Sequence, residues 1–108
     1  MKTHRDLATG TLIATLPGDL TSTTTEQLRT EFNALLDPLA QAKADWKTFR
    51  LELPAAKMVD SVGLNLIVSL LKMVRQHGAQ MQIACGNPNV HRTFLFTRLD
   101  KHLELIKL

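Results

Sequence analysis

Ser61 is the residue whose setting first suggests chemistry. It lies in the run from Met58 to Leu64, where a strand-like approach, Met58-Val59, gives way to a helix. A serine at the start of a helix is most often an N-cap, because its hydroxyl can accept a hydrogen bond from an amide one turn further on. The sequence therefore predicts that the Ser61 side chain is the N-cap of this helix.

Gly63 indicates that the start of this helix has a role beyond capping. A glycine inside the first turn of a helix costs conformational entropy. It also leaves the backbone uncrowded, so that another surface can approach closely. We therefore expect Gly63 to lie where a binding partner makes contact.

The neighbours of Ser61 exclude a hydrolytic serine. A nucleophile elbow has the pattern G-x-S-x-G, whereas Val59 stands two residues before Ser61 and Asp60 directly before it. The chain also lacks a G-x-x-x-x-G-K-[ST] loop and the Rossmann glycines. We expect no enzymatic activity and no cofactor, so that any phosphate on Ser61 must come from another protein.

No metal site or disulfide is predicted. The single cysteine, Cys85, cannot form an internal disulfide and is interpreted as a buried thiol. The four histidines are too scattered to form a ligand cluster. They are His4, His77, His91 and His102.

Length and composition indicate one domain spanning residues 1–108. The chain has 108 residues and is 44% hydrophobic, enough for one core. Its net charge of +3 is spread without a basic block, and only 5% of residues are aromatic, which argues against nucleic-acid binding. No apolar run is long enough to insert into a membrane, and residues 1–6 do not resemble a signal peptide. We therefore expect a cytoplasmic protein.

The elements that position Ser61 alternate between strands and helices. Phe49, Leu51 and Leu53 alternate with Arg50 and Glu52, the clearest strand signal in the chain. Strands alternating with helices indicate an α/β fold with helices packed on a mixed sheet. Strands are predicted at residues 11–16, 48–53, 80–85 and 103–107, with a short one near residues 5–8.

Three helices are predicted between these strands. Thr23 and Glu26 have the spacing of a capping box for the first, which Pro38 should end or kink near Asp37. The second begins at the Ser61 segment and closes at His77-Gly78. The third has Asn87 as its N-cap and Pro88 at its first position.

The second helix carries more apolar surface than a sheet needs to cover it. Its apolar residues span an arc of about 240°, against roughly 100° for a helix packed on one surface. The excess either packs against neighbouring helices or forms a docking stripe for a partner that runs away from Ser61. That stripe would consist of Val62, Leu66, Leu70 and Met73.

The segment from Asp60 to Leu64 resembles the D-S-x-G-L signature of STAS domains of the bacterial anti-sigma-factor antagonist type. Gly18-Asp19-Leu20 is similar to the G-x-L turn of that family. Residues 87–90 and 97–100 resemble its closing helix and its T/S-x-L segment. The order of these motifs covers nearly the whole chain. The resemblance implies the STAS fold, a four- to five-stranded mixed sheet with about three to four helices.

The resemblance also implies a regulatory switch. In this family a partner anti-sigma factor that is a serine kinase phosphorylates the serine that matches Ser61, and a serine phosphatase reverses the reaction. The unmodified form binds the anti-sigma factor and frees the sigma factor. The residues expected to contact the partner are Asp60, Val62, Gly63, Leu66, Asp19 and Thr21. A weak homodimer is also compatible with the apolar edge.

Three positions depart from the family pattern. Thr21 follows the G-x-L turn where many members have an acidic residue, and Asp19 lies two residues earlier. Val62 replaces a second hydroxyl, which leaves Ser61 as the one acceptor in the motif. Glu52 stands where the strand often carries aspartate.

Two other functions remain open. A STAS module that is never phosphorylated, such as an accessory subunit of a lipid-transport ATPase or a signalling scaffold, would differ mainly in its gene neighbours. A DNA-binding module would show binding that falls with salt, but no recognition-helix motif supports it.

Overall fold

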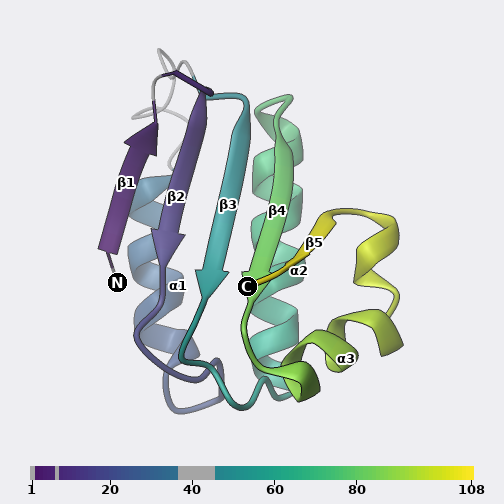
Figure 1. Cartoon of the computed structure of the whole chain (residues 1–108). Helices are drawn as coiled ribbons and strands as arrows, with labels where there is room; N and C mark the ends of the chain where they lie inside the picture. The colour runs from purple at the N-terminus through teal and green to yellow at the C-terminus, as the bar shows by residue number, and fades with distance from the viewer. Residues whose placement is uncertain (1, 7, 37–45) are drawn as a thin grey trace.

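The computed structural model describes residues 2–6, 8–36 and 46–108. Five strands form one sheet in the order β1-β2-β3-β4-β5, with β1 antiparallel to β2 and the remaining pairs parallel (Figure 1). The strands are β1 (Lys2–Asp6), β2 (Thr11–Thr15), β3 (Thr48–Leu53), β4 (Gln80–Cys85) and β5 (Glu104–Lys107). The helices are α1 (Thr25–Leu35), α2 (Ser61–Gln76), α3 (Pro88–Phe96) and the short 3-10 helix η1 (Leu99–Lys101).

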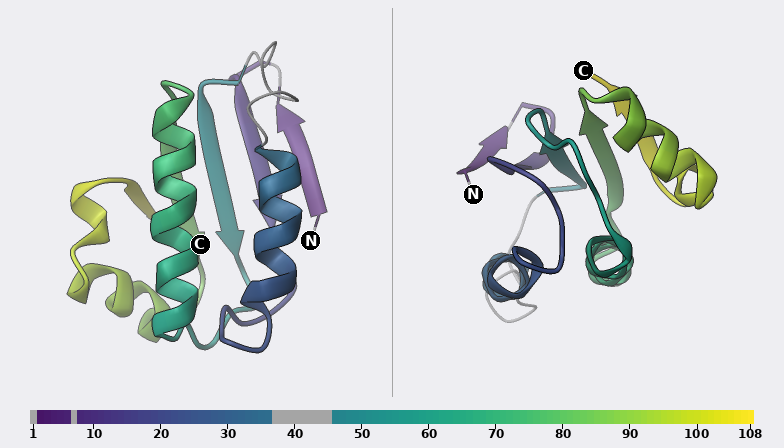
Figure 2. Two further views of the ribbon diagram at one scale, coloured as in Figure 1. Left: turned by 180° about the vertical axis from the view of Figure 1, so that it is seen from behind. Right: turned by 90° about the horizontal axis from the view of Figure 1, so that it is seen from below.

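The helices cover the sheet unequally. Figure 2 shows α1 and α2 side by side on one face, while α3 lies beyond β4 and β5 at the end of the sheet. This is the mixed α/β sheet that the sequence predicts, and the described residues contain three α-helices and one 3-10 helix.

The core forms where alternating strand residues meet in register beneath α1 and α2. Leu12 pairs with Phe49, and Phe49 pairs with Met81. One row further along, Leu51 pairs with Ile83. All five side chains are buried. Successive side chains of a strand point to opposite faces of the sheet, so every second residue lies on the helix-covered face. This is why apolar and polar residues alternate so clearly in the sequence of β3.

Several predicted boundaries are confirmed. β3 and β4 have the predicted bounds. Asn87 caps α3, with its side chain accepting from the amides of Asn89 and Val90, and Pro88 is the first helical residue. α2 ends as expected, with Gly78 at φ 73°, a left-handed conformation that suits glycine. The Cys85 thiol is free and buried, and burial raises its pKa.

Other boundaries differ from the prediction. β1 covers residues 2–6 rather than 5–8, β2 ends at Thr15, and β5 begins at Glu104. η1 was not predicted. The predicted end of the first helix near Asp37 and Pro38 lies outside the described residues, and α1 ends at Leu35.

The predicted capping box at Thr23 is wrong. α1 begins at Thr25, and Thr24 is the flanking residue. The Thr23 hydroxyl instead pairs with the hydroxyl of Thr21, at 2.9 Å. The Thr24 hydroxyl donates to the carbonyl of Asp19, at 3.0 Å, so it secures the preceding loop rather than the helix amides.

Of the two alternatives for the excess apolar surface of α2, packing inside the molecule is confirmed and the docking stripe is not. Leu66 and Leu70 are each 1% exposed, and Met73 is half-buried against the core. The sheet covers one side of α2 and α1 packs against another. The apolar residues of α2 that remain exposed are Val62 and Val68.

Within the described residues, no helix has the length and apolar character needed to cross a membrane. In the same part of the chain, no group of three histidine, cysteine, aspartate or glutamate side chains could hold a metal ion.

Candidate functional site

Two loops meet below the carboxyl ends of β2 and β3. Residues 16–24 connect β2 to α1, and residues 54–60 connect β3 to α2; together we call them the two-loop junction (Figure 1). Their backbones pair at Leu20 and Val59 in a parallel bridge. The Leu20 amide donates to the Met58 carbonyl at 3.1 Å, and the Asp60 amide donates to the Leu20 carbonyl at 3.2 Å. The junction therefore continues the pairing of β2 with β3 beyond the sheet.

Asp60 is the N-cap of α2. Its Oδ1 accepts from the Gly63 amide at 2.9 Å, and its Oδ2 accepts from the Ser22 amide at 2.9 Å. The prediction that Ser61 caps this helix is wrong, because the carboxylate one residue earlier has already taken the first-turn amide. One side chain thus starts the helix and holds the other loop.

The amides of Gly63 and Ser22 lower the pKa of Asp60 below its ordinary value of 3.8. Hydrogen bonds to a carboxylate favour its ionised form. Asp60 is therefore a fixed negative charge beside Ser61 at neutral pH.

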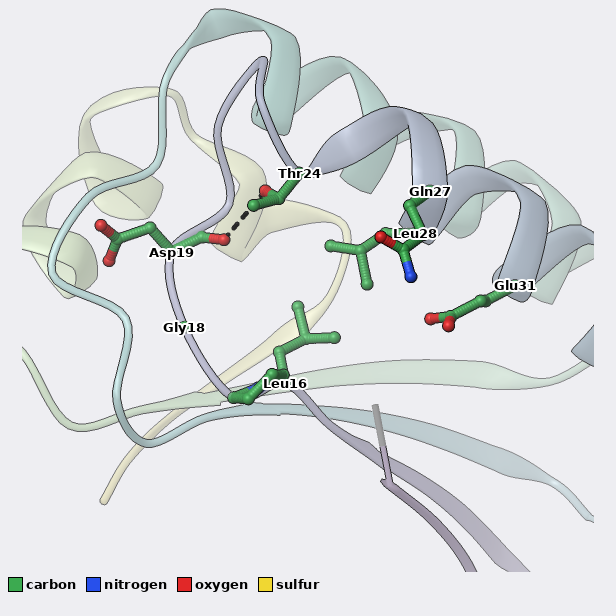
Figure 3. A pocket seen from close by; sticks show the side chains of 8 residues that line it. Leu16, Gly18, Asp19, Thr24, Gln27, Leu28 and Glu31 are labelled. Atoms are coloured by element: carbon green, nitrogen blue, oxygen red, sulfur yellow. Dashed lines mark hydrogen bonds between the residues drawn. The ribbon is translucent and has the colours of Figure 1, made fainter.

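Asp19 makes the reciprocal connection. Its Oδ1 accepts from the amides of Lys57 and Met58, at 2.7 and 3.2 Å. Figure 3 shows its carboxylate directed away from α1, while its main-chain carbonyl accepts from Thr24. Each loop of the junction therefore supplies one carboxylate to amides of the other.

Gly63 is buried at the point where α2 crosses the first loop. A Cβ at this position would overlap the carbonyl oxygen of Leu20 and lie 2.9 Å from its carbonyl carbon. The close neighbour that the glycine admits is thus the chain's own backbone. The expectation that Gly63 contacts a binding partner is corrected accordingly.

Ser61 is the first residue of α2, and its side chain is exposed. The Ser61 hydroxyl makes no hydrogen bond to any of the described residues. A group added to this oxygen would therefore break no hydrogen bond with the described residues. Two apolar residues near Ser61 in the sequence are also exposed, Met58 by 58% and Val62 by 39%.

The structure brings together most of the residues singled out in the sequence. Asp19 and Thr21 lie in the first loop, and Asp60, Ser61, Val62 and Gly63 lie at the start of α2. Thr21 is half-buried, and its carbonyl accepts from the amides of Thr24 and Thr25. Leu66 is sealed in the core and lies outside this surface.

Sequence reasoning missed the roles of Leu20, Ser22 and Met58. Each takes part through its backbone, in contacts between residues 38 to 40 positions apart in the chain. Backbone groups carry no side-chain signature, so no local pattern could have identified them.

A pocket of about 260 Å³ adjoins the junction beside α1 (Figure 3). Leu16 and Leu28 form its apolar wall, and Gln27 and Glu31 line its polar side. Neither Ser61 nor Asp60 lines this pocket, so it adjoins the surface around Ser61 and is not part of it.

Comparison with known proteins identifies the family of this chain. The sequence model of the STAS domain matches residues 2–107. An anti-sigma F factor antagonist of Paenibacillus polymyxa is 29% identical over 101 residues, covering 94% of this chain and 79% of the relative.

Solved structures share the fold at low sequence identity. A candidate anti-sigma factor antagonist from Thermotoga maritima superposes with a TM-score of 0.82 at 18% identity, covering 99% of this chain and 86% of that one. The anti-sigma factor antagonist SpoIIAA superposes in its unphosphorylated form with a TM-score of 0.72 at 17% identity, covering 99% and 88%. The phosphorylated form of the Bacillus SpoIIAA superposes with a TM-score of 0.67 at 15% identity, covering 99% of this chain and 89% of that one.

Replacing Gly63 by alanine is expected to destabilise the protein by about 2 kcal/mol or more, because the added methyl group must displace the Leu20 backbone. Urea unfolding followed by circular dichroism measures this. Gly18→Ala is the matched control: a Cβ there meets nothing within 4 Å. Equal unfolding midpoints for the two variants would contradict the proposed contact.

Replacing Asp60 by asparagine should cost stability in a pH-dependent way. A carboxyl group whose pKa is lowered on folding stabilises the fold above its unfolded pKa of about 4, and loses this effect as the pH falls through the folded pKa. Wild type should exceed Asp60→Asn at pH 7, and the gap should close as the solution is acidified below pH ~4. Unfolding midpoints between pH 7 and 2.5 test this, with Glu26→Gln as control; a gap independent of pH would refute it.

Proposed function

This chain belongs to the STAS domain family, and we propose that it acts as an anti-sigma-factor antagonist that is switched by phosphorylation of Ser61. The observation that carries the proposal is the exposed Ser61 hydroxyl, which has no hydrogen-bond partner among the described residues and stands on a helix end secured by Asp60. The Paenibacillus relative, named as an anti-sigma F factor antagonist, supports it.

The unmodified protein would bind an anti-sigma factor through the surface around Ser61. Met58 and Val62 give this surface exposed apolar area, and the neutral hydroxyl lies between them in the sequence. The anti-sigma factor would also be the serine kinase that modifies Ser61, and a serine phosphatase would restore the hydroxyl. The protein would act in the cytoplasm, where sigma factors act, and would have no catalytic activity of its own.

Phosphorylation would act by charge and bulk at the contact. A phosphate adds about −1.5 to −2 charges, beside the carboxylate of Asp60. The Gly63 amide, which could otherwise help to neutralise an anion at the helix N-terminus, is already bonded to Asp60. The modified surface would therefore repel a partner that fits a neutral hydroxyl.

The same geometry explains why the fold would survive the modification. The Ser61 side chain is exposed, and the junction is held by Asp19, Asp60 and the Leu20 backbone. None of those contacts uses the Ser61 hydroxyl. A phosphate on that oxygen would change the surface without removing an internal hydrogen bond.

Ser61→Asp should weaken binding of the anti-sigma partner at least tenfold, equivalent to about 1.4 kcal/mol, while Ser61→Ala should retain it. The partner is captured from the source cells on the immobilised Ser61→Ala protein, purified, and titrated by calorimetry. Gln76→Glu adds the same charge at the far end of α2 and should bind like wild type.

Equal affinity for Ser61→Asp and Ser61→Ala would refute the switch. Mass spectrometry of the protein from its native cells provides a second test, since a phosphate on Ser61 is expected under some growth condition. Its absence under every condition would favour a STAS module that binds constitutively.

Val62→Ser should weaken the same partner by about fivefold, because roughly 1 kcal/mol of apolar burial is lost at the contact. Val68→Ser is a matched control on the same helix, since Val62 is 39% exposed and Val68 is 37% exposed. Both variants should unfold at similar urea concentrations. An equal loss of affinity in both would place the contact elsewhere on α2.

A further inference from the structure

A second cavity, of about 400 Å³, lies toward the opposite end of α2 from Ser61. Its walls come from the last turns of α2, the start of β4, and the segment that joins η1 to β5. Figure 2 shows this joining segment outside the part of the sheet that α1 and α2 cover. The volume lies within the range typical of small-molecule sites.

Three basic side chains from two separate segments line this cavity. Arg75 belongs to α2, Lys101 ends η1, and His102 follows it. The acidic residue in the lining is Glu104, whose Oε2 accepts from the Gln82 side-chain amide at 2.8 Å. Two permanent positive charges against one negative charge leave the cavity with a net positive charge.

Arg75 and His102 hold one another in a defined arrangement. Nη2 of Arg75 lies 3.3 Å from the His102 carbonyl oxygen and 3.3 Å from His102 Nδ1. A guanidinium only donates, so Nδ1 must accept. The other ring nitrogen, Nε2, makes no hydrogen bond to any of the described residues.

Part of the cavity lining is apolar. Leu71, Ala79, Met81 and Leu103 line it and belong to the core, with exposed fractions of 6%, 8%, 3% and 7%. Most core side chains deeper in the sheet are 0 to 1% exposed. The cavity thus reaches the edge of the core. Its lining combines apolar side chains of the core with the basic side chains of Arg75, Lys101 and His102.

We propose that this cavity binds a phosphate monoester that carries a small apolar body. Arginine and lysine donate to the several acceptor oxygens of a phosphate, with the His102 ring beside them, and the apolar lining residues would contact the organic part. The C-terminus of α2 is the negative end of its helix dipole, which accounts for a cation at Arg75. It does not account for Lys101 and His102, which come from a different segment. The site is independent of Ser61 and of the proposed switch.

Phenyl phosphate is a suitable probe because it has a phosphate and an apolar ring. Titrated into ¹⁵N-labelled full-length protein at low ionic strength, it should shift the amides of residues 75, 79–81 and 101–104 saturably. Arg75→Gln and Lys101→Gln should each weaken binding about tenfold, as expected for loss of a charge-assisted hydrogen bond.

Lys72→Gln is the control, since Lys72 is an exposed cation on the same helix and does not line the cavity. It should leave the affinity unchanged. Thermal unfolding checks each variant; if Arg75→Gln unfolds, the exposed Lys101 still provides the test. The absence of saturable shifts, shifts centred on other basic residues, or an equal loss in Lys72→Gln would overturn the proposal.

Discussion

The candidate site depends on two carboxylates, each held by amides of the loop opposite. Asp19 accepts from Lys57 and Met58, and Asp60 accepts from Ser22 while it caps α2. Backbone amides that leave a sheet lose their ladder partners and must find others. The two side chains meet this need in both directions, so neither loop can move away without exposing the amides of both.

In this arrangement the residue that caps α2 is not the residue of the proposed switch. If Ser61 were the cap, its hydroxyl would be engaged with a first-turn amide, and a phosphate would remove that bond and destabilise the helix. Asp60 takes the capping bond instead, and its lowered pKa keeps it ionised. The serine oxygen is left to solvent, so modification can change what binds the surface while the helix start remains intact.

The parts of the fold that the sequence predicts well are those with a local cause. β3 and β4 follow from strict alternation over single segments, and Asn87 and Pro88 mark the start of α3 by their own backbone preferences. Errors arose where the deciding neighbour is distant in the chain. Asp60 and Ser61 are both favoured N-cap residues, and the bond of Asp60 to the Ser22 amide, 38 positions away, is invisible in the local sequence. Leu66 is buried because α1 and the sheet both cover α2, which periodicity along one helix cannot reveal.

The D-S-x-G-L motif therefore contains two kinds of information. Asp60 and Gly63 are required by the junction, since one carboxylate joins the loops and only a hydrogen in place of a side chain fits against the Leu20 carbonyl. Leu64 is half-buried against the core. Ser61 and Val62 are the exposed members, and no fold requirement on the described residues explains a serine at the first. A chain could thus keep the fold with alanine at position 61. Under the proposed function, the hydroxyl at that position is what would distinguish a switch from a constitutive binding module, on a helix end that Asp60 and Gly63 hold in place.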